Sequence, residues 1–265
     1  MGYLQNGGDL KMWMTNRSDN WKYRGYLGSV DYKFSALIPE AALEVGVKVF
    51  PWFGLCLSAG YLPKKWIATL DVTAPWDTPG NTIKLTESVQ ARFLPLSLSG
   101  LFSLPLSFLD INFQGGVAYY LAQFDYSLTG NVLNPNNAGK LNYRWAYAES
   151  FETTNISRFG YHLGLGLEFK LSSHMGLVVE TRYRKVKFTD IKGSRHYKSN
   201  EIWAGGSSSR EESEPDVTWE LESSLAPWGG RTYHCEFVKH IEPPARPFVI
   251  NLDGLFLTAG VKIRL

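Results

Sequence analysis

One histidine of the sequence, His162, could serve as a catalytic base. Ser58, Ser97 and Ser99 fall at positions of matching parity in neighbouring alternating segments, so each is a candidate nucleophile. A serine nucleophile needs a base within hydrogen-bond reach and a third group that orients the base. No spacing in this chain singles out such a triad. We therefore expect His162 to be a hydrogen-bonding group inside the fold, and we expect no enzymatic activity.

A second group of residues has the types that bind metal ions. His234, Cys235 and His240, with Glu236 nearby, could hold one, but they lack an established ligand spacing. Gly164-Leu165-Gly166 lacks the third glycine and the following helix of a dinucleotide-binding loop. We expect neither a metal nor a cofactor. The net charge of +2 gives no nucleic-acid footprint.

The strongest pattern in the chain runs from Phe159 to Leu171. Its odd positions are large and apolar and its even positions are small or polar, which is the two-residue period of a β-strand. The apolar positions are Phe159, Tyr161, Leu163, Leu165, Leu167, Phe169 and Leu171. After a short polar turn, the return strand separates Leu177, Val179 and Tyr183 from Glu180, Arg182 and Arg184. An unbroken apolar face suits lipid, and a charged face backed by glycines suits the inside of a closed barrel.

Charged residues recur on the faces that would point into such a barrel. They are Glu44, Lys48, Asp110, Glu168, Lys170, Glu180, Arg182, Arg184, Lys262 and Arg264. An eight-stranded barrel is just wide enough for side chains to fill, so charges of both signs would meet as an ion-pair network. Unpaired charges there would be costly. We expect this network, with His162, to plug the lumen; a narrow polar pore is the functional alternative.

Alternation marks further strands at 43–49, 55–61, 109–121 and 255–265, and the second continues towards Leu70. The segment 83–103 contains Pro95, which cannot donate to a strand ladder, so a bulge or a locally unpaired position is expected there. Turn residues and charges fill four other segments. These are 7–40, 71–81, 130–154 and 192–247, expected to be outer loops of a single domain spanning 1–265. Within the last, 217–221 and 231–238 can pair as a hairpin that projects from the barrel mouth.

The lengths of the connections alternate between long and short along the chain. Outer-membrane barrels have this asymmetry, with short periplasmic turns and long outer loops. Counting Gly2–Gln5 as the remnant of a truncated first strand gives eight antiparallel strands. No run of about 18 apolar residues exists, which excludes membrane-spanning helices but not strands of roughly ten residues.

The N-terminal segment lacks the basic and apolar regions of a secretion signal, and we expect the signal to have been removed. Asp9 can cap a short helix whose Leu10, Trp13 and Met14 share one side. Two interpretations of this helix are open. It can pack on the barrel rim, or it can rest on lipid headgroups as an interfacial helix.

These features resemble the small eight-stranded outer-membrane β-barrels of the OmpX/OmpW-like superfamily. The matching segments are Leu43–Phe50, Leu55–Tyr61, Ile111–Tyr120, Gly160-x3-Gly164-x-Gly166-Leu167-Glu168-Phe169, the C-terminal strand and Gly7-Gly8-Asp9-Leu10. The resemblance implies an all-β, up-and-down transmembrane barrel in the bacterial outer membrane. It also implies contact with the lipid bilayer and with the outer-membrane assembly machinery.

The resulting hypothesis is a small outer-membrane barrel with a plugged lumen, whose outer loops contact an unknown ligand or surface partner. The alternative is a narrow channel or transporter for small solutes, apolar ones included. A lipid-modifying outer-membrane enzyme and a soluble lipocalin-like binder are less favoured. The lipocalin-like barrel would turn its aliphatic face inward and Glu168, Arg182 and Arg184 outward.

Overall fold

The computed structural model describes residues 2–6, 8–15, 27–32, 34–74, 81–135, 141–153, 155–225, 231–239, 241 and 245–263. These residues form an all-β fold in which every strand pair is antiparallel. Residues 9–15 are helical. Within the described ranges no helix has the length and apolar character needed to cross a membrane.

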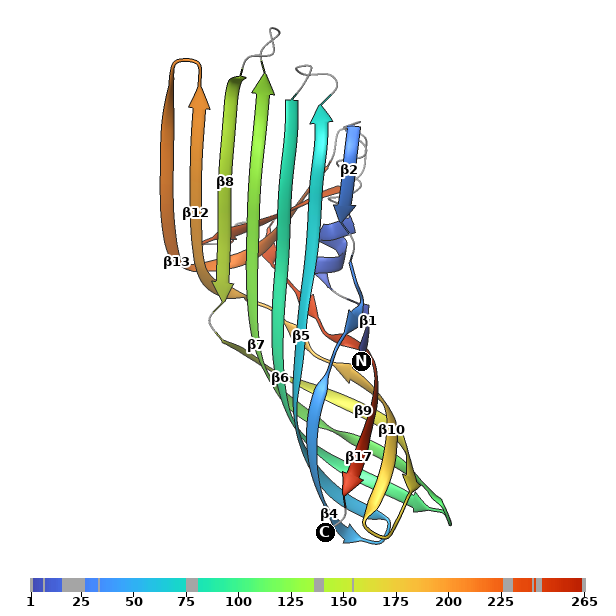
Figure 1. Cartoon of the computed structure of the whole chain (residues 1–265). Coiled ribbons are helices and arrows are strands. Elements are labelled where there is room, and N and C mark those ends of the chain that lie inside the picture. Colours follow the sequence, from blue (N-terminus) through green and yellow to red (C-terminus); the bar gives the residue numbers. More distant parts are fainter. Residues whose placement is uncertain are drawn as a thin grey trace.

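The strands form a curled lower part and a tall upper part (Figure 1). The lower part contains β1 (Gly2–Asn6), β3 (Leu37–Ile38), β4 (Ala41–Phe50), β5 (Phe53–Ala74), β6 (Asn81–Pro105), β7 (Leu109–Pro135), β9 (Ile156–Lys170), β10 (Met175–Lys185) and β17 (Asp253–Ile263). The remaining strands are β2 (Leu27–Tyr32), β8 (Leu141–Thr153), β11 (Lys187–Phe188), β12 (Lys192–Trp203), β13 (Gly206–Leu225), β14 (Arg231–Val238), β15 (Arg246–Pro247) and β16 (Ile250–Asn251).

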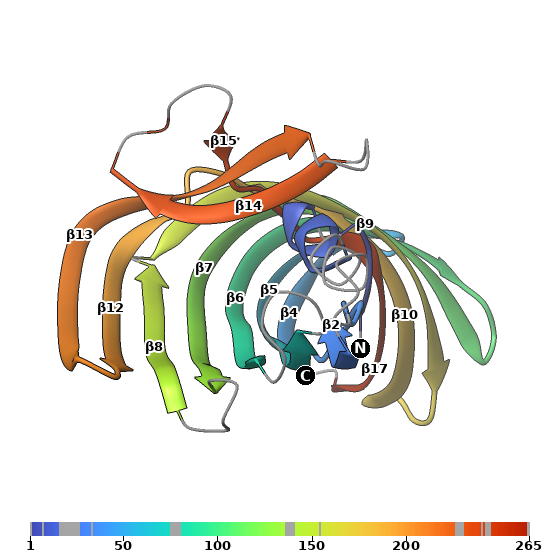
Figure 2. The same cartoon turned by 90° about the horizontal axis from the view of Figure 1, so that it is seen from above.

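In the lower part the sheet curls round on itself, with the pairing order β4-β5-β6-β7-β9-β10-β17-β1-β3 (Figure 2). The described strands do not close it into the expected eight-stranded barrel. Among them, β4 pairs only with β5, and residues 258–263 of β17 pair only with β10. The short β1 lies between β17 and β3 at one end of this gap. We call the gap between β4 and residues 258–263 of β17 the seam.

The side chains of the curled part are sorted by face as the alternation predicts. On β9, Leu163 is 62% exposed, whereas Glu168 is 1% exposed and Arg182 on the neighbouring β10 is 4% exposed. Leu163 therefore points outward, and Glu168 and Arg182 point inward, as the alternation predicts. The same exposures contradict the lipocalin-like alternative, which requires the aliphatic face to be enclosed.

Above the curled part, β5, β6 and β7 continue as long strands of an upper sheet (Figure 1). The partner of β7 changes along its length: residues 109–122 pair with β9, and residues 125–135 pair with β8. β12 and β13 then extend the sheet from β8. β5, β6 and β7 therefore join the two parts, and β7 changes its second neighbour between them.

Much of two segments expected to be irregular loops is strand. The 130–154 segment contains the end of β7 and all of β8, and the 192–247 segment contains β12, β13 and β14. On β8, Tyr143, Trp145 and Tyr147 alternate with smaller residues, a strand pattern without the aliphatic–glycine alternation of the lower part. β12 and residues 206–216 of β13 are largely polar on both faces, so the pairing of β12 with β8 and of β13 with β12, rather than pattern, determines their structure.

Two finer expectations about the long strands hold. β5 continues without a break beyond Leu70 to Ala74. At Pro95, β6 keeps its pairing with Tyr120 of β7. Its pairing with β5 lapses for two rungs, between Leu96 and Phe93, without a shift in register. Pro95 therefore occupies a locally unpaired position, and no bulge forms.

Residues 218–225 of β13 pair with β14, as predicted, but this hairpin crosses the inner side of the long strands instead of projecting away from them (Figures 1 and 2). Trp219 stacks on Phe248 with ring centroids 4.1 Å apart, and it also contacts the rings of Tyr126 and Phe151. The inner side of the upper sheet is thus an apolar core.

The helix at 9–15 belongs to the same core. Leu10, Trp13 and Met14 are each 2% exposed or less, which supports packing inside the fold and contradicts the interfacial helix on lipid headgroups. The Asp9 carboxylate accepts hydrogen bonds from Arg246 at 2.6 and 2.7 Å and from the Val249 N–H at 2.8 Å. Gly8 has a φ of 64°, and a Cβ there would lie 2.5 Å from the Val249 carbonyl oxygen, so this attachment needs glycine.

We expect Trp219→Ala to lower the free energy of unfolding by about 3–5 kcal/mol, because it leaves a large cavity among stacked rings. Urea unfolding of the protein folded in detergent micelles measures this loss. Trp203→Ala is the matched control, because Trp203 is an exposed residue next to the β12–β13 turn, and its loss should stay within about 0.5 kcal/mol. Equal losses in the two variants would contradict the assigned core.

Candidate functional site

A network of charged side chains lies on the inner face of the curled sheet, and Arg182 of β10 is at its centre. Arg182 donates hydrogen bonds to Glu180 at 2.9 Å and to Gln114 at 2.8 Å, and it forms an ion pair with Glu44. These partners come from β10, β7 and β4. A guanidinium presents several donors in a fixed geometry, so one buried arginine can hold three strands together.

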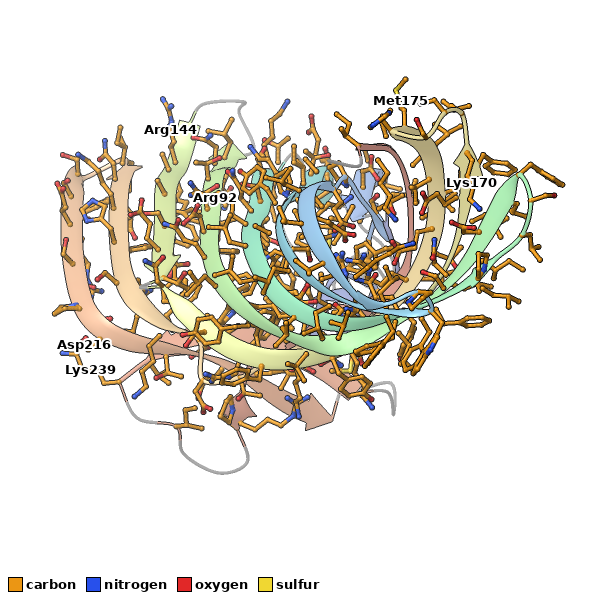
Figure 3. The ribbon with its side chains drawn as sticks, turned by 90° about the horizontal axis from the view of Figure 1, so that it is seen from below. Arg92, Arg144, Lys170, Met175, Asp216 and Lys239 are labelled. Atoms are coloured by element: carbon orange, nitrogen blue, oxygen red, sulfur yellow. The ribbon has the colours of Figure 1, made fainter. Side chains whose placement is uncertain are left out.

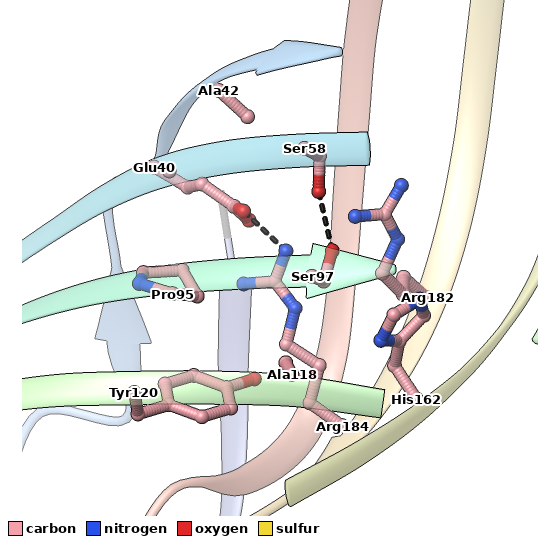
Figure 4. Close-up of a pocket in the computed structure, with 11 residues that line it drawn as sticks. Glu40, Ala42, Ser58, Pro95, Ser97, Ala118, Tyr120, His162, Arg182 and Arg184 are labelled. Carbon is pink, nitrogen blue, oxygen red and sulfur yellow. Dashed lines mark hydrogen bonds and ion pairs between the residues drawn. The ribbon is translucent and has the colours of Figure 1, made fainter. Parts of the chain in front are cut away.

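Arg184 follows Arg182 by two residues on β10, on the same face of the sheet, and forms an ion pair with Glu40. Both side chains are almost fully buried, and the Arg184 guanidinium also lies 4.5 Å from the ring centroid of Phe256. Figure 4 shows the pair beside Tyr120, with Glu40 approaching from the segment between β3 and β4. Buried charges are tolerable only when paired, and this pair meets that condition.

Two further pairs lie nearer the β9–β10 turn. Lys262 contacts Glu168 at 2.6 Å, and Lys170 contacts Asp110 at 2.6 Å. Figure 3 places Lys170 at this end of the sheet. Lys48 is exposed, and no ion pair joins it to another described residue. Arg264 lies outside the described residues.

His162 is buried on the same inner face and shares a hydrogen bond with Ser99, 2.8 Å between Nε2 and Oγ. Among the described residues no carboxylate is hydrogen bonded to its other ring nitrogen. Ser97 instead pairs with Ser58 (Figure 4). The cavity beside these residues measures about 10 Å³, room for roughly one water molecule. The dyad therefore has no space for a substrate.

Aromatic rings fill the inner face directly above this network. Phe188 contacts Phe93 and Phe124 with ring centroids 5.4 and 5.6 Å apart, and Tyr120 at 6.4 Å. All four are fully buried. We call these rings the aromatic plug. Together with the Trp219 core, the aromatic plug separates the charged network from the upper end of the sheet.

The outer face of the curled part changes character along a single rung of the ladder. Pro63, Arg92 and Gln123 are paired neighbours on β5, β6 and β7. On β6, the outward residues below this rung are apolar and those above it are polar. The apolar ones are Leu94, Leu96, Leu98, Phe102 and Leu104, and the polar ones are Lys84, Thr86, Ser88 and Gln90.

Aromatic side chains border this apolar zone at both ends. Tyr61, Tyr119, Phe159, Tyr161 and Tyr183 lie at the upper border. At the lower border Trp52 stacks with Phe50 and Phe102, 5.6 and 5.9 Å between centroids. We call the zone between these rings the apolar band. Aromatic residues at both edges of an apolar band are typical of barrels in a membrane.

In the upper sheet, charges are paired differently. Arg195 of β12 donates to Glu149 of β8 and to Glu214 of β13, so one arginine ties three strands. The pKa of Arg195 lies above its ordinary value: burial lowers it, and the two carboxylates raise it by more. The guanidinium therefore stays charged at any pH at which the protein folds.

No three His, Cys, Asp or Glu side chains of the described residues lie close enough together to hold a metal ion. The candidate group in the last expected loop is only partly within those residues. Cys235 and His234 lie in β14, where only their backbone is described, and His240 lies outside the described residues.

A family model for the outer membrane protein beta-barrel domain matches residues 15–205. The chain belongs to this outer-membrane β-barrel family. It is therefore a small barrel protein of the bacterial outer membrane, in contact with the lipid bilayer. No curated protein and no solved structure matches the chain.

Sequence reasoning missed two members of the barrel protein's inner network, Glu40 and Gln114. Glu40 precedes the recognised strand, but it has the same even parity as Glu44, so extending the alternation backwards would have found it. Gln114 also shares parity with its strand neighbour Asp110, but it is uncharged, so a pattern of ionic residues does not include it.

We expect Arg184→Met to destabilise the protein by about 3–5 kcal/mol, because it leaves the buried Glu40 carboxylate without its partner. Adding Glu40→Leu removes the stranded charge, so the double variant should be more stable than the single one. Urea unfolding in micelles measures both. Lys48→Met, at an exposed site of the same face, should change stability by no more than about 0.5 kcal/mol. Additive losses in the double variant would contradict direct pairing.

Proposed function

We propose that this protein is a membrane-spanning, eight-stranded barrel with a side-chain-plugged lumen, which presents its upper sheet as a surface for interaction outside the membrane. The observation that carries the proposal is the shared rung at which the outward residues of β5, β6 and β7 change from mainly apolar to mainly polar, with Ile67 of β5 as an exposed exception above it. A bilayer surface is flat, so a boundary at a similar height on neighbouring strands is what it would select.

The height of the apolar band supports a single crossing of the membrane. β6 crosses the band from Leu94 to Leu104. Eleven residues at about 3.3 Å each, tilted by about 45°, rise by about 25 Å. This matches the height of the apolar zone that outer-membrane barrels present to lipid.

The pairing order of the curled part supports a barrel of eight strand positions. They are β4, β5, β6, β7, β9, β10, β17 and β1, with β3 leading into β4. A barrel of this size leaves an interior that side chains fill. The ion pairs of Arg182 and Arg184 and the aromatic plug occupy that interior, which favours a plugged lumen over a channel. We propose that this barrel is one of the OmpX/OmpW-like proteins. We also propose that the outer-membrane assembly machinery inserts it.

The described residues of the expected outer loops 7–40, 71–81, 130–154 and 192–247 lie mainly at the end of the barrel that we assign to the outside. Their strands, β8, β12 and β13 above all, make the upper sheet a rigid platform in place of mobile loops. We propose that a ligand or surface partner contacts this platform. Enzymatic activity is not part of the proposal, because Ser99 and His162 lie beneath the aromatic plug.

Leu165→Arg should destabilise the protein folded in phospholipid vesicles by about 2–4 kcal/mol, because it places a charge near the middle of the apolar band. Thr86→Arg, on the outward face above the boundary, should cost less than about 1 kcal/mol. Guanidinium unfolding in vesicles measures both. Equal costs, or a neutral Leu165→Arg, would place the band in water and contradict the membrane-spanning proposal.

Planar-bilayer recordings of the folded protein should give no steady single-channel steps, because paired charges and rings occupy the interior. The variant Arg182→Ala/Glu44→Ala removes a pair while keeping the net charge, and any conductance should appear only there. Steady steps from the unchanged protein would favour the channel alternative over the plugged lumen.

A further inference from the structure

Aromatic rings gather on the inner side of the upper sheet, near the upper end of β8 (Figure 1). Tyr143, Trp145 and Tyr147 lie on this side because they alternate in step with the buried Phe151. The rings of Trp145 and Tyr147 stack with their centroids 4.3 Å apart. Trp203 of β12 is paired with Tyr143 and is 43% exposed. We call the rings of Tyr143, Trp145, Tyr147 and Trp203 the aromatic patch.

Glu201 of β12 lies among these rings. It is paired directly with Trp145, and Trp203 follows it by two residues on the same face. Directly opposed residues of antiparallel strands have their side chains in contact. Partial burial raises the pKa of Tyr143 above its ordinary value, and so do the nearby Glu201 and Tyr197. The Glu201 carboxylate therefore lies close to the Tyr143 ring as well.

Lower on the same face, the chain itself combines a cation with carboxylates and a ring. Arg195 donates hydrogen bonds to Glu149 and Glu214. Its guanidinium also lies 5.6 Å from the ring centroid of Tyr197. A carboxylate and the face of an aromatic ring both attract an organic cation, so the two together hold it better than either alone. Both carboxylates here have a cationic partner from within the chain.

At Glu201 the carboxylate and the rings are present, but the cation is missing. Within the part of the chain that the structure describes, no ion pair joins Glu201 to another residue. Its neighbours on the side away from β8 are small: Ser208 is its partner on β13, and Ser199 precedes it on the same face. Arg210, diagonally across on β13, donates to Glu212 at 2.6 Å instead. Glu201 is partly exposed, so a cation from outside can reach it.

We propose that Glu201 and the aromatic patch bind a small organic cation of the quaternary ammonium class. The inference names the class of ligand for the upper sheet, and it rests on the function proposed above. The charge of such a cation offsets the carboxylate that lacks a partner, and its methyl groups contact the faces of the rings. It carries no N–H donors, so it needs no further acceptors on this shallow surface.

Calorimetric titration with choline tests the site in the whole chain folded in dodecyl maltoside micelles, whose headgroups carry no ammonium group. The control ligand is the neutral isostere of choline, in which carbon replaces the charged nitrogen. Glu201→Gln removes the charge and keeps the shape of the side chain. Glu211→Gln is the matched control variant, because Glu211 is an exposed carboxylate on the opposite face of the neighbouring strand.

We expect saturable binding of choline at one site per chain. Binding should be weaker by about tenfold or more for the neutral isostere and for Glu201→Gln, and nearly unchanged for Glu211→Gln. Ser208→Arg places a guanidinium opposite Glu201 and supplies the missing cation from within the chain. It should therefore weaken choline binding as much as Glu201→Gln does, while the protein stays folded.

Equal affinities for choline and its isostere, or for choline in Glu201→Gln and Glu211→Gln, would overturn the cation site. Tighter binding of acetyl-lysine methylamide than of choline would also overturn it, in favour of a lysine side chain from a partner protein. Insertion of the same chains into phospholipid vesicles is read separately from heat-modifiable migration on gels. A chain that inserts but does not bind choline overturns this inference alone. Failure to insert would overturn the proposed function, and this inference with it.

Discussion

The structure depends on one constraint: in hydrocarbon, every backbone N–H and C=O must find its partner within the protein. Antiparallel strands meet this demand through their neighbours, and the alternation of side chains then decides which face meets lipid. Leu163, Leu165 and Leu167 lie on the outer face because the same strand places His162 and Glu168 on the inner one. The pairing order, the apolar band and the aromatic borders all follow from this arrangement.

The same alternation of side chains places charged residues on the inner face, where they need partners. Alternation carries charged residues into an interior too narrow for bulk water, where isolated charges are costly. Arg182 and Arg184 of β10 are neutralised by acidic partners on the other side of the seam, in β4 and in the segment before it. These ion pairs join strands that have no ladder between them. The aromatic plug and the Trp219 core then exclude water from above. The inner face of one sheet therefore carries a polar interior in the curled part and an apolar core in the upper part.

Much of the lower part could be predicted from the sequence. Its residues face either outward or into the interior, so apolar and polar side chains alternate strictly along each strand. The β9–β10 hairpin, the continuation of β5 and the unpaired position at Pro95 all follow from local residues. Apart from the hairpin of β13 and β14, the upper part could not be predicted in this way. β12 and residues 206–216 of β13 are largely polar on both faces, and they become strands by pairing with β8 and with each other. The alternation of β4, extended backwards, includes Glu40, but its partner Arg184 lies more than a hundred residues away, so the sequence does not show the ion pair.

Spin labels placed one at a time on the outward residues of β6, from Lys84 to Leu104, locate the membrane boundary in the protein folded into vesicles. The collision rates of each label with oxygen, which concentrates in hydrocarbon, and with a water-soluble nickel complex give its depth. We expect collisions with oxygen to dominate from Leu94 to Leu104 and collisions with nickel to dominate from Lys84 to Gln90, with the crossover at Arg92. Nickel dominance along the whole strand, or a crossover far from Arg92, would contradict this expectation.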